Sequence, residues 1–154
     1  MQALDWNGDG LIDFYSASRL YINQGNWKFK NIRQSVGLPE LFDEGFKIFD
    51  YNNDGLLDFL YMHPNYGPVL YVNHDGYFSK ESPAFENGYC REAFGLNVAD
   101  INGDSYEDVL AGGGYNESGG LAQPKLFVYQ SGRYKSSGFV DGFYGWSDLV
   151  SVGV

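Results

Sequence analysis

The amino-acid sequence predicts an all-β protein built from repeated units of antiparallel strands. Three observations support this prediction: aromatic residues make up 18% of the 154 residues, glycine occurs 21 times, and an Asp-rich segment recurs three times. Aromatic residues favour strands and glycines favour tight turns, whereas a helical bundle needs long runs of good helix formers. With 44% apolar residues the chain can bury a core, and we expect one domain over residues 1–154.

The three Asp-rich segments share one pattern over nine positions. Aspartate occupies positions 1, 5 and 9, and asparagine occupies position 3, in every copy. The copies start at residues 5, 50 and 100, and this spacing matches the length of one four-stranded propeller blade. We therefore expect three β-propeller blades of four antiparallel strands, one per repeat, at about residues 1–49, 50–99 and 100–154.

Apolar segments around each loop predict the strands of a blade. A first segment follows each loop directly, at residues 14–15, 59–61 and 109–111. A second segment follows at residues 20–23, 70–73 and 126–129, and each ends in a glycine-containing hairpin turn that leads into a further strand. A strand also precedes the two later loops, at residues 45–49 and 94–99, and residues 149–154 have the same apolar character.

The side chains of the loops predict calcium sites. Ca²⁺ is bound by about six to eight oxygens, and oxygens at alternate positions of a tight loop can converge on one point. Position 7 would add a backbone carbonyl, and glycine at position 6 permits the turn. The expected ligands are Asp5, Asn7, Asp9, Leu11 and Asp13, then Asp50, Asn52, Asp54, Leu56 and Asp58, then Asp100, Asn102, Asp104, Tyr106 and Asp108.

Two alternatives to these calcium sites have to be weighed. An EF-hand needs an acidic residue at position 12 and flanking helices, but position 12 is Ser16, Tyr61 or Ala111 and the flanks are strand-like. Asx-rich turns without any metal are the other alternative. Ser105 replaces the glycine of position 6 in the third loop, so we expect that site to be the most distorted or the weakest.

The formal net charge of −10 bears on the possible partners. It argues against binding to nucleic acid or to an anionic membrane surface, since both require basic residues. Nine aspartates among the 20 acidic residues lie in the three loops, so much of this charge is explained by metal ligation. We expect no membrane insertion, because no apolar stretch approaches the ~20 residues of a spanning helix.

Short motifs beside the loops resemble a known repeat family. Phe94-Gly95 before Asp100, and Ala111-Gly112-Gly113 after Asp108, are similar to the two halves of the FG-GAP/VCBS repeat of integrin-alpha-like propellers. The resemblance implies that each loop joins the first two strands of a blade and holds structural calcium on one face, with ligands often on the opposite face. Propellers typically have about four to eight blades, so we expect further blades of the same protein, or a homo-oligomer.

Candidate ligand-contacting residues follow from the loops expected on the opposite face. The distance from the last loop aspartate to the next aligned leucine grows from 7 to 12 to 18 residues, and long loops often carry function. Aromatic rings beside amide and charged groups suit sugar or peptide surfaces, although propeller aromatics also pack between blades. The candidates are His63, Asn65, Tyr66, Tyr115 and Asn116, with Tyr89, Arg91, Tyr144 and Trp146 between blades.

The sequence favours a binding module over an enzyme. No nucleophile, base and acid stand at a useful spacing, and the chain has two histidines, His63 and His74. We expect an extracellular adhesion module that recognises carbohydrate or protein surfaces, because loops of this type bind calcium weakly, at about 10⁻⁴ to 10⁻³ M. The alternatives are part of a polysaccharide-active lyase or hydrolase, and a purely structural segment of a larger secreted protein or toxin.

Overall fold

A computed structural model describes residues 1–16, 19–40, 45–63, 67–82, 84–86, 95–112 and 124–139. The regular secondary structure of these residues is entirely β, which confirms the predicted fold class. In the described part of the chain, no helix is long and apolar enough to cross a membrane.

The strands form three sheets, here called blades 1 to 3. Blade 1 contains β1 (Gln2–Leu4), β2 (Asp13–Ser16), β3 (Arg19–Asn23) and β4 (Phe29–Asn31). Blade 2 contains β5 (Phe46–Phe49), β6 (Asp58–His63), β7 (Gly67–Asn73) and β8 (Phe78–Glu81). Blade 3 contains β10 (Gly95–Ala99), β11 (Asp108–Gly112), β12 (Lys125–Gln130) and β13 (Arg133–Phe139), together with β9 (Phe85–Glu86).

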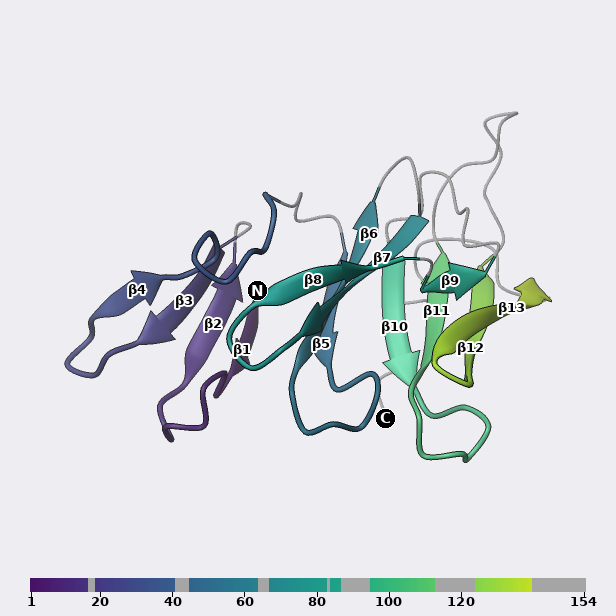
Figure 1. Cartoon of the computed structure of the whole chain (residues 1–154), viewed down its shortest axis with the longest axis horizontal. Coiled ribbons are helices and arrows are strands. Elements are labelled where there is room, and N and C mark those ends of the chain that lie inside the picture. Colours follow the sequence, from purple (N-terminus) through teal and green to yellow (C-terminus); the bar gives the residue numbers. More distant parts are fainter. Residues whose placement is uncertain are drawn as a thin grey trace.

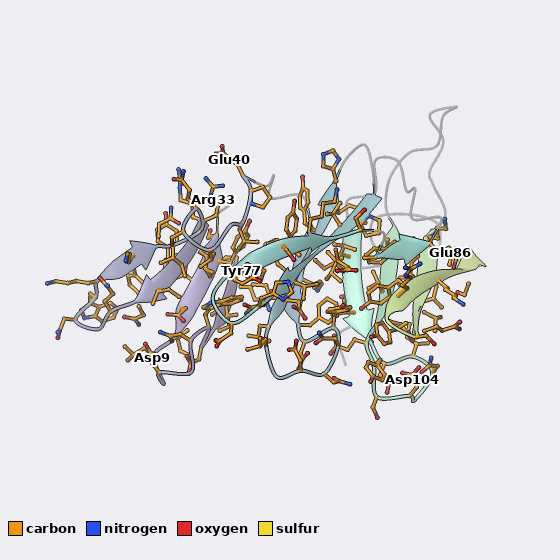
Figure 2. The ribbon with its side chains drawn as sticks, in the orientation of Figure 1. Asp9, Arg33, Glu40, Tyr77, Glu86 and Asp104 are labelled. Carbon is orange, nitrogen blue, oxygen red and sulfur yellow. The ribbon has the colours of Figure 1, made fainter. Side chains whose placement is uncertain are left out.

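Within each blade, the four main strands pair in antiparallel fashion in the order of the sequence, and β9 lies outside this pattern. The Asp-rich loops connect the first and second strands, and the glycine-containing turns connect the third and fourth, as expected. Figure 1 shows the blades side by side, with these loops and hairpin turns along the same edge of the molecule. In Figure 2, Asp9 and Asp104 mark this edge, whereas Arg33 and Glu40 lie at the opposite one.

Aromatic side chains fill the space between blades 1 and 2. Tyr15 of β2 is 1% exposed, and its ring lies 4.5 Å from the ring of Phe46 and 4.8 Å from that of Phe59. Successive residues of a strand point to opposite faces, so Phe59 faces blade 1 while Leu60 packs into the core shared with blade 3. The interior of the molecule therefore consists of two cores, one at each junction between blades.

The segment that leaves one blade contacts the outer strand of the next, and we call it the strap. After blade 1, the carbonyl of Val36 accepts a hydrogen bond of 2.7 Å from the N–H of Phe78. After blade 2, the carbonyl of Ala84 accepts one of 2.9 Å from the N–H of Tyr134, at the equivalent position of blade 3. An outer strand has unpaired N–H and C=O groups, and the strap satisfies some of them.

The second strap departs from the sequence expectation. It continues as β9, which pairs in parallel with β13, so the third sheet has five strands rather than four. Two residues form this strand, which is too short for a periodic sequence pattern to reveal. Its position depends on pairing with β13, in which Phe85 lies opposite Tyr134, a residue 49 positions later in the chain.

The second connection of blade 2 is shorter than expected. β6 and β7 pair as far as His63 and Gly67, so residues 64–66 alone connect them. The additional residues of this repeat therefore lengthen two strands instead of forming a long loop. In blade 3, most of the connection, residues 113–123, lies outside the described part of the chain.

Candidate metal centres

The three loops share the same internal hydrogen bonds. In the first loop, the carboxylate of Asp5 accepts the N–H of Asp9 at 3.1 Å and the N–H of Gly10 at 2.9 Å. The carboxylate of Asp9 in turn accepts the N–H of Leu11 at 2.8 Å. The second and third loops repeat these bonds at distances from 2.8 to 3.1 Å. The repeated residue pattern thus produces one repeated backbone shape.

Serine adopts the glycine conformation in the third loop. Gly10 and Gly55 have φ angles of 81° and 86°, and Ser105 has a φ angle of 70°. The N–H of Ser105 donates to Asp100 at 2.9 Å, as the glycines do in their loops, and this bond holds the pKa of Asp100 below its usual value. Ser105 therefore keeps the shape of the loop while occupying a left-handed conformation that side chains disfavour.

The aspartates at position 9 connect the loops to the sheets. Asp13, Asp58 and Asp108 are each 0% exposed. In every case one carboxylate oxygen accepts the N–H of loop position 2, at 2.8, 3.0 and 3.2 Å. The other oxygen accepts an N–H from the last part of the third strand, at 2.7, 2.8 and 3.0 Å. A buried carboxylate without such donors would be costly, so these bonds make the burial possible.

Burial dominates the electrostatics of this position in blade 2. It raises the pKa of Asp58 to about 6, although the N–H groups of Asn73 and Tyr51 act in the opposite direction. The nearby carboxylates of Asp54 and Asp50 raise this pKa further. Three carboxyl groups in nine residues repel one another, and a bound cation relieves such repulsion.

The donor set of the loops fits the chemistry of calcium. It consists of carboxylate, amide and carbonyl oxygens, which are the ligands that Ca²⁺ prefers, and no loop position carries a cationic side chain. In the arrangement described, the carboxylates satisfy N–H groups of the loop itself. No three acidic, histidine or cysteine side chains of the described residues gather closely enough to hold a metal together.

Two asparagines support the loops in a way that the sequence analysis missed. The amide of Asn23 donates to the carbonyl of Ile12, and that of Asn73 donates to the carbonyl of Leu57, both at 3.1 Å. These residues end the third strand of blades 1 and 2. The recurrence of asparagine at the same place in both repeats was the available signal, and the third repeat has Tyr129 there.

The candidate ligand residues are placed only in part. His63 ends β6, at the opposite end of the strand from the loop, and its ring lies 6.0 Å from that of Tyr61. Desolvation lowers its pKa, with a smaller contribution from Lys80. The other candidates lie outside the described residues, namely Asn65, Tyr66, Tyr89, Arg91, Tyr115, Asn116, Tyr144 and Trp146.

The loops and blades match a known repeat family. Its model, described as FG-GAP-like repeat, matches residues 5–61 and 50–111, which together cover more than half of the chain. The chain belongs to the FG-GAP-like repeat family. The resemblance noted in the sequence is therefore confirmed, and the three antiparallel sheets are β-propeller blades.

The FG-GAP-like chain is similar to parts of integrin alpha subunits. It is 29% identical over 123 residues to integrin alpha-6 of Gallus gallus, which covers 72% of this chain and 11% of that protein. It is 30% identical over 112 residues to integrin alpha-6 of Homo sapiens, covering 65% and 10%. For integrin alpha-3 of Cricetulus griseus the identity is 29% over 120 residues, covering 70% and 11%. The chain thus spans about a tenth of the length of these relatives.

Proposed function

We propose that this chain is a calcium-stabilised extracellular module of adhesion type, which recognises carbohydrate or protein surfaces. The observation that carries the proposal is the threefold recurrence of one loop shape around one oxygen-rich residue set. Random variation would not keep the same four side chains in three loops, together with a left-handed backbone conformation at position 6 of each. A shared ligand requirement accounts for both features.

In this proposal each loop holds Ca²⁺ through its side chains at positions 1, 3, 5 and 9 and the carbonyl of position 7. The ion would supply positive charge where three carboxylates are close in sequence. Asp13, Asp58 and Asp108 extend the effect into the blades, since the same side chains accept N–H groups of the third strands. Calcium would thereby fix the edge of each blade rather than take part in a reaction.

The adhesion-type role and the extracellular location rest on the relatives. Their name, integrin alpha, is that of cell-surface adhesion receptors. The family model matches residues 5–61 and 50–111, which include all three loops. Weak calcium binding in the range of about 10⁻⁴ to 10⁻³ M suits an extracellular location, where calcium is abundant.

The aromatic residues on the outer face of blade 1 favour a further partner, namely a neighbouring blade of the same protein. Phe14 is half-buried there, whereas the equivalent residues Phe59 and Val109 are 1% and 0% exposed because a preceding blade covers them. Phe29 is 40% exposed, whereas its equivalent Phe78 is 6% exposed. The rings of Phe14 and Phe29 lie 5.0 Å apart and present an aromatic surface. A second copy of the chain is the alternative occupant.

Thermal unfolding in EDTA and in rising calcium tests the proposal. A metal that binds the folded state alone stabilises it by about 2.7 kcal/mol per site at a hundredfold excess over Kd. We expect a rise in Tm that saturates in millimolar calcium, with a smaller rise in magnesium. The matched control is the variant Asp5→Ala, Asp50→Ala, Asp100→Ala, which should lose the calcium response. An equal Tm in EDTA and in calcium would contradict the proposal.

A further inference from the structure

Blade 3 departs from the repeat at three positions that lie close together in space. Each of them is a tyrosine in blade 3 and a smaller or less polar side chain in the other blades. Tyr106 replaces Leu11 and Leu56, Tyr129 replaces Asn23 and Asn73, and Tyr134 replaces Phe29 and Phe78.

The replacement at position 134 compensates for the one at position 129. In blades 1 and 2 an asparagine amide holds the carbonyl of loop position 8. In blade 3 the hydroxyl of Tyr134 donates to that carbonyl, of Glu107, at 3.2 Å. The loop therefore keeps its support although the asparagine is absent. The side chain of Tyr129 does not hold this carbonyl, and its aromatic ring instead packs against the core between blades 2 and 3.

The rings of Tyr106 and Tyr129 form a stacked pair, which we call the tyrosine shelf. Their centroids are 4.6 Å apart, and their planes differ by 20°. Tyr134 and Tyr51 hold the Tyr129 ring by edge contacts at 5.6 and 6.0 Å. Both rings of the shelf are half-buried, so each is fixed by the protein and still reaches the surface.

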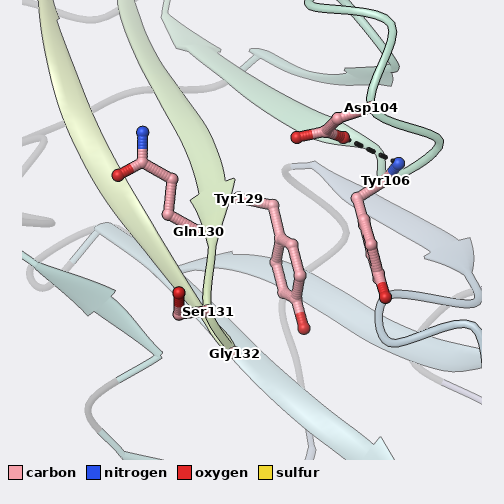
Figure 3. Close-up of a pocket in the computed structure, with 6 residues that line it drawn as sticks. All are labelled: Asp104, Tyr106, Tyr129, Gln130, Ser131 and Gly132. Atoms are coloured by element: carbon pink, nitrogen blue, oxygen red, sulfur yellow. Dashed lines mark hydrogen bonds between the residues drawn. The ribbon is translucent and has the colours of Figure 1, made fainter.

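A hollow of about 530 Å³ adjoins the shelf, within the range of about 300 to 1,000 Å³ that is usual for small-molecule sites. Figure 3 shows the two rings side by side with their hydroxyls pointing the same way, Asp104 beyond one end and Gln130 beside Tyr129. The residues that line the hollow are Asp104, Tyr106, Tyr129, Gln130, Ser131 and Gly132.

We propose that this hollow is a subsite for a neutral pyranose ring. The inference rests on the proposed function and specifies where the carbohydrate would bind. The apolar C–H groups of a sugar would pack against the faces of the aromatic rings. Gln130, Ser131 and the phenol hydroxyls would form hydrogen bonds with the sugar hydroxyls. None of the six lining residues is cationic, so no side chain of the hollow would pair with the carboxylate of an acidic sugar, and a neutral sugar is favoured.

The charge of the hollow also distinguishes a sugar from a cationic peptide. Both oxygens of Asp104 already accept hydrogen bonds, from the N–H of Tyr106 at 2.9 Å and from the amide of Asn102 at 3.0 Å. Its charge is therefore partly satisfied within the loop, and a cation gains less from it. Asp104 also belongs to the third loop, so the subsite borders a proposed calcium site on the edge opposite to His63.

Saturation-transfer NMR with the methyl pyranosides of glucose, galactose and mannose tests the subsite on the full chain in millimolar calcium. The decisive variant is Tyr129→Asn, which restores the asparagine of blades 1 and 2. The matched control is Tyr77→Asn, because Tyr77 is 56% exposed in the hairpin turn of blade 2. We expect at least one pyranoside to bind, with affinity reduced about tenfold or more in Tyr129→Asn and unchanged in Tyr77→Asn.

Several outcomes would overturn the inference, and they separate it from the proposed function. If the wild type and Tyr129→Asn bind a pyranoside equally well, the proposed subsite is wrong, but the proposal that the chain recognises carbohydrate is not contradicted. If no pyranoside binds, the proposed subsite is wrong. The rise of Tm in calcium would still test the proposed calcium sites independently. Tighter binding of methyl glucuronide than of methyl glucoside would contradict the charge argument, and binding of an Arg-rich peptide alone would favour a cationic ligand.

Discussion

Asp58 binds the N–H of Asn73 through a hydrogen bond of 2.8 Å and so joins the second loop to the third strand of its blade. Its second carboxylate oxygen accepts the N–H of Tyr51 at 3.0 Å. The same pair of bonds occurs in the other two blades. The last aspartate of each loop is therefore a structural link as well as a candidate calcium ligand.

Replacement of Asp58 by alanine should destabilise the protein even without calcium. It would leave the buried N–H of Asn73 and the partly buried N–H of Tyr51 without an acceptor, and we expect the free energy of unfolding to fall by about 2–4 kcal/mol. Asp58→Asn keeps one oxygen acceptor and should lose less. Urea unfolding in EDTA measures both, and Glu86→Ala, on the exposed side chain of β9, is the control. A loss in Asp58→Ala no larger than in the control would refute the structural role.

Replacement of Ser105 by glycine should stabilise the third loop. Ser105 has a φ angle of 70°, a conformation that glycine adopts readily, so we expect a gain of about 0.5–1 kcal/mol in the free energy of unfolding. The reciprocal variant Gly55→Ser should lose a similar amount in blade 2. Paired urea titrations measure both changes, and a loss of stability in Ser105→Gly would show that its hydroxyl has an unrecognised task.

Replacement of Gly37 by alanine should weaken the contact between the first strap and blade 2. Gly37 has a φ angle of 80°, and an added Cβ would lie 3.1 Å from the carbonyl oxygen of Phe78. Gly25→Ala is the matched control, because Gly25 has a φ angle of 74° and nothing within 4 Å of an added Cβ. We expect about 1 kcal/mol of destabilisation for Gly25→Ala and a larger loss for Gly37→Ala.

The measurement for the glycine pair is thermal unfolding of both variants beside the wild type. If the two variants lose the same stability, the left-handed conformation explains the whole effect and the close approach to Phe78 contributes nothing.

The imidazole of His63 should titrate below the ordinary histidine value of about 6.5, because desolvation lowers its pKa. A folded-state pKa below the unfolded one means that the unfolded chain binds more protons. The contribution of His63 to stability is therefore present above the unfolded pKa and is lost as the pH falls through it to the folded pKa. Proton NMR titration of the ring measures this pKa, and a value above 6.5 would contradict the prediction.

Much of the blade could be predicted because its signals are local. The loop positions, the flanking apolar segments and the glycine-containing turns each depend on neighbours in sequence, and the structure confirms β2, β6 and β11 directly after the loops. The length of the blade 2 connection was misjudged because residue counts do not distinguish a long loop from long strands. The straps were missed because their hydrogen bonds join residues such as Val36 and Phe78, which are far apart in sequence.

The sequence by itself determined the repeat, the loop chemistry and the family, since three copies of one pattern act as their own comparison. Only the tertiary structure decided which side chains support the loops and which surfaces stay open. The hydroxyl of Tyr134 replaces an asparagine amide from another position of the blade, and Phe14 is half-buried where Phe59 is fully buried. Such relationships depend on strand register and on the packing of neighbouring blades, which no segment of sequence specifies alone.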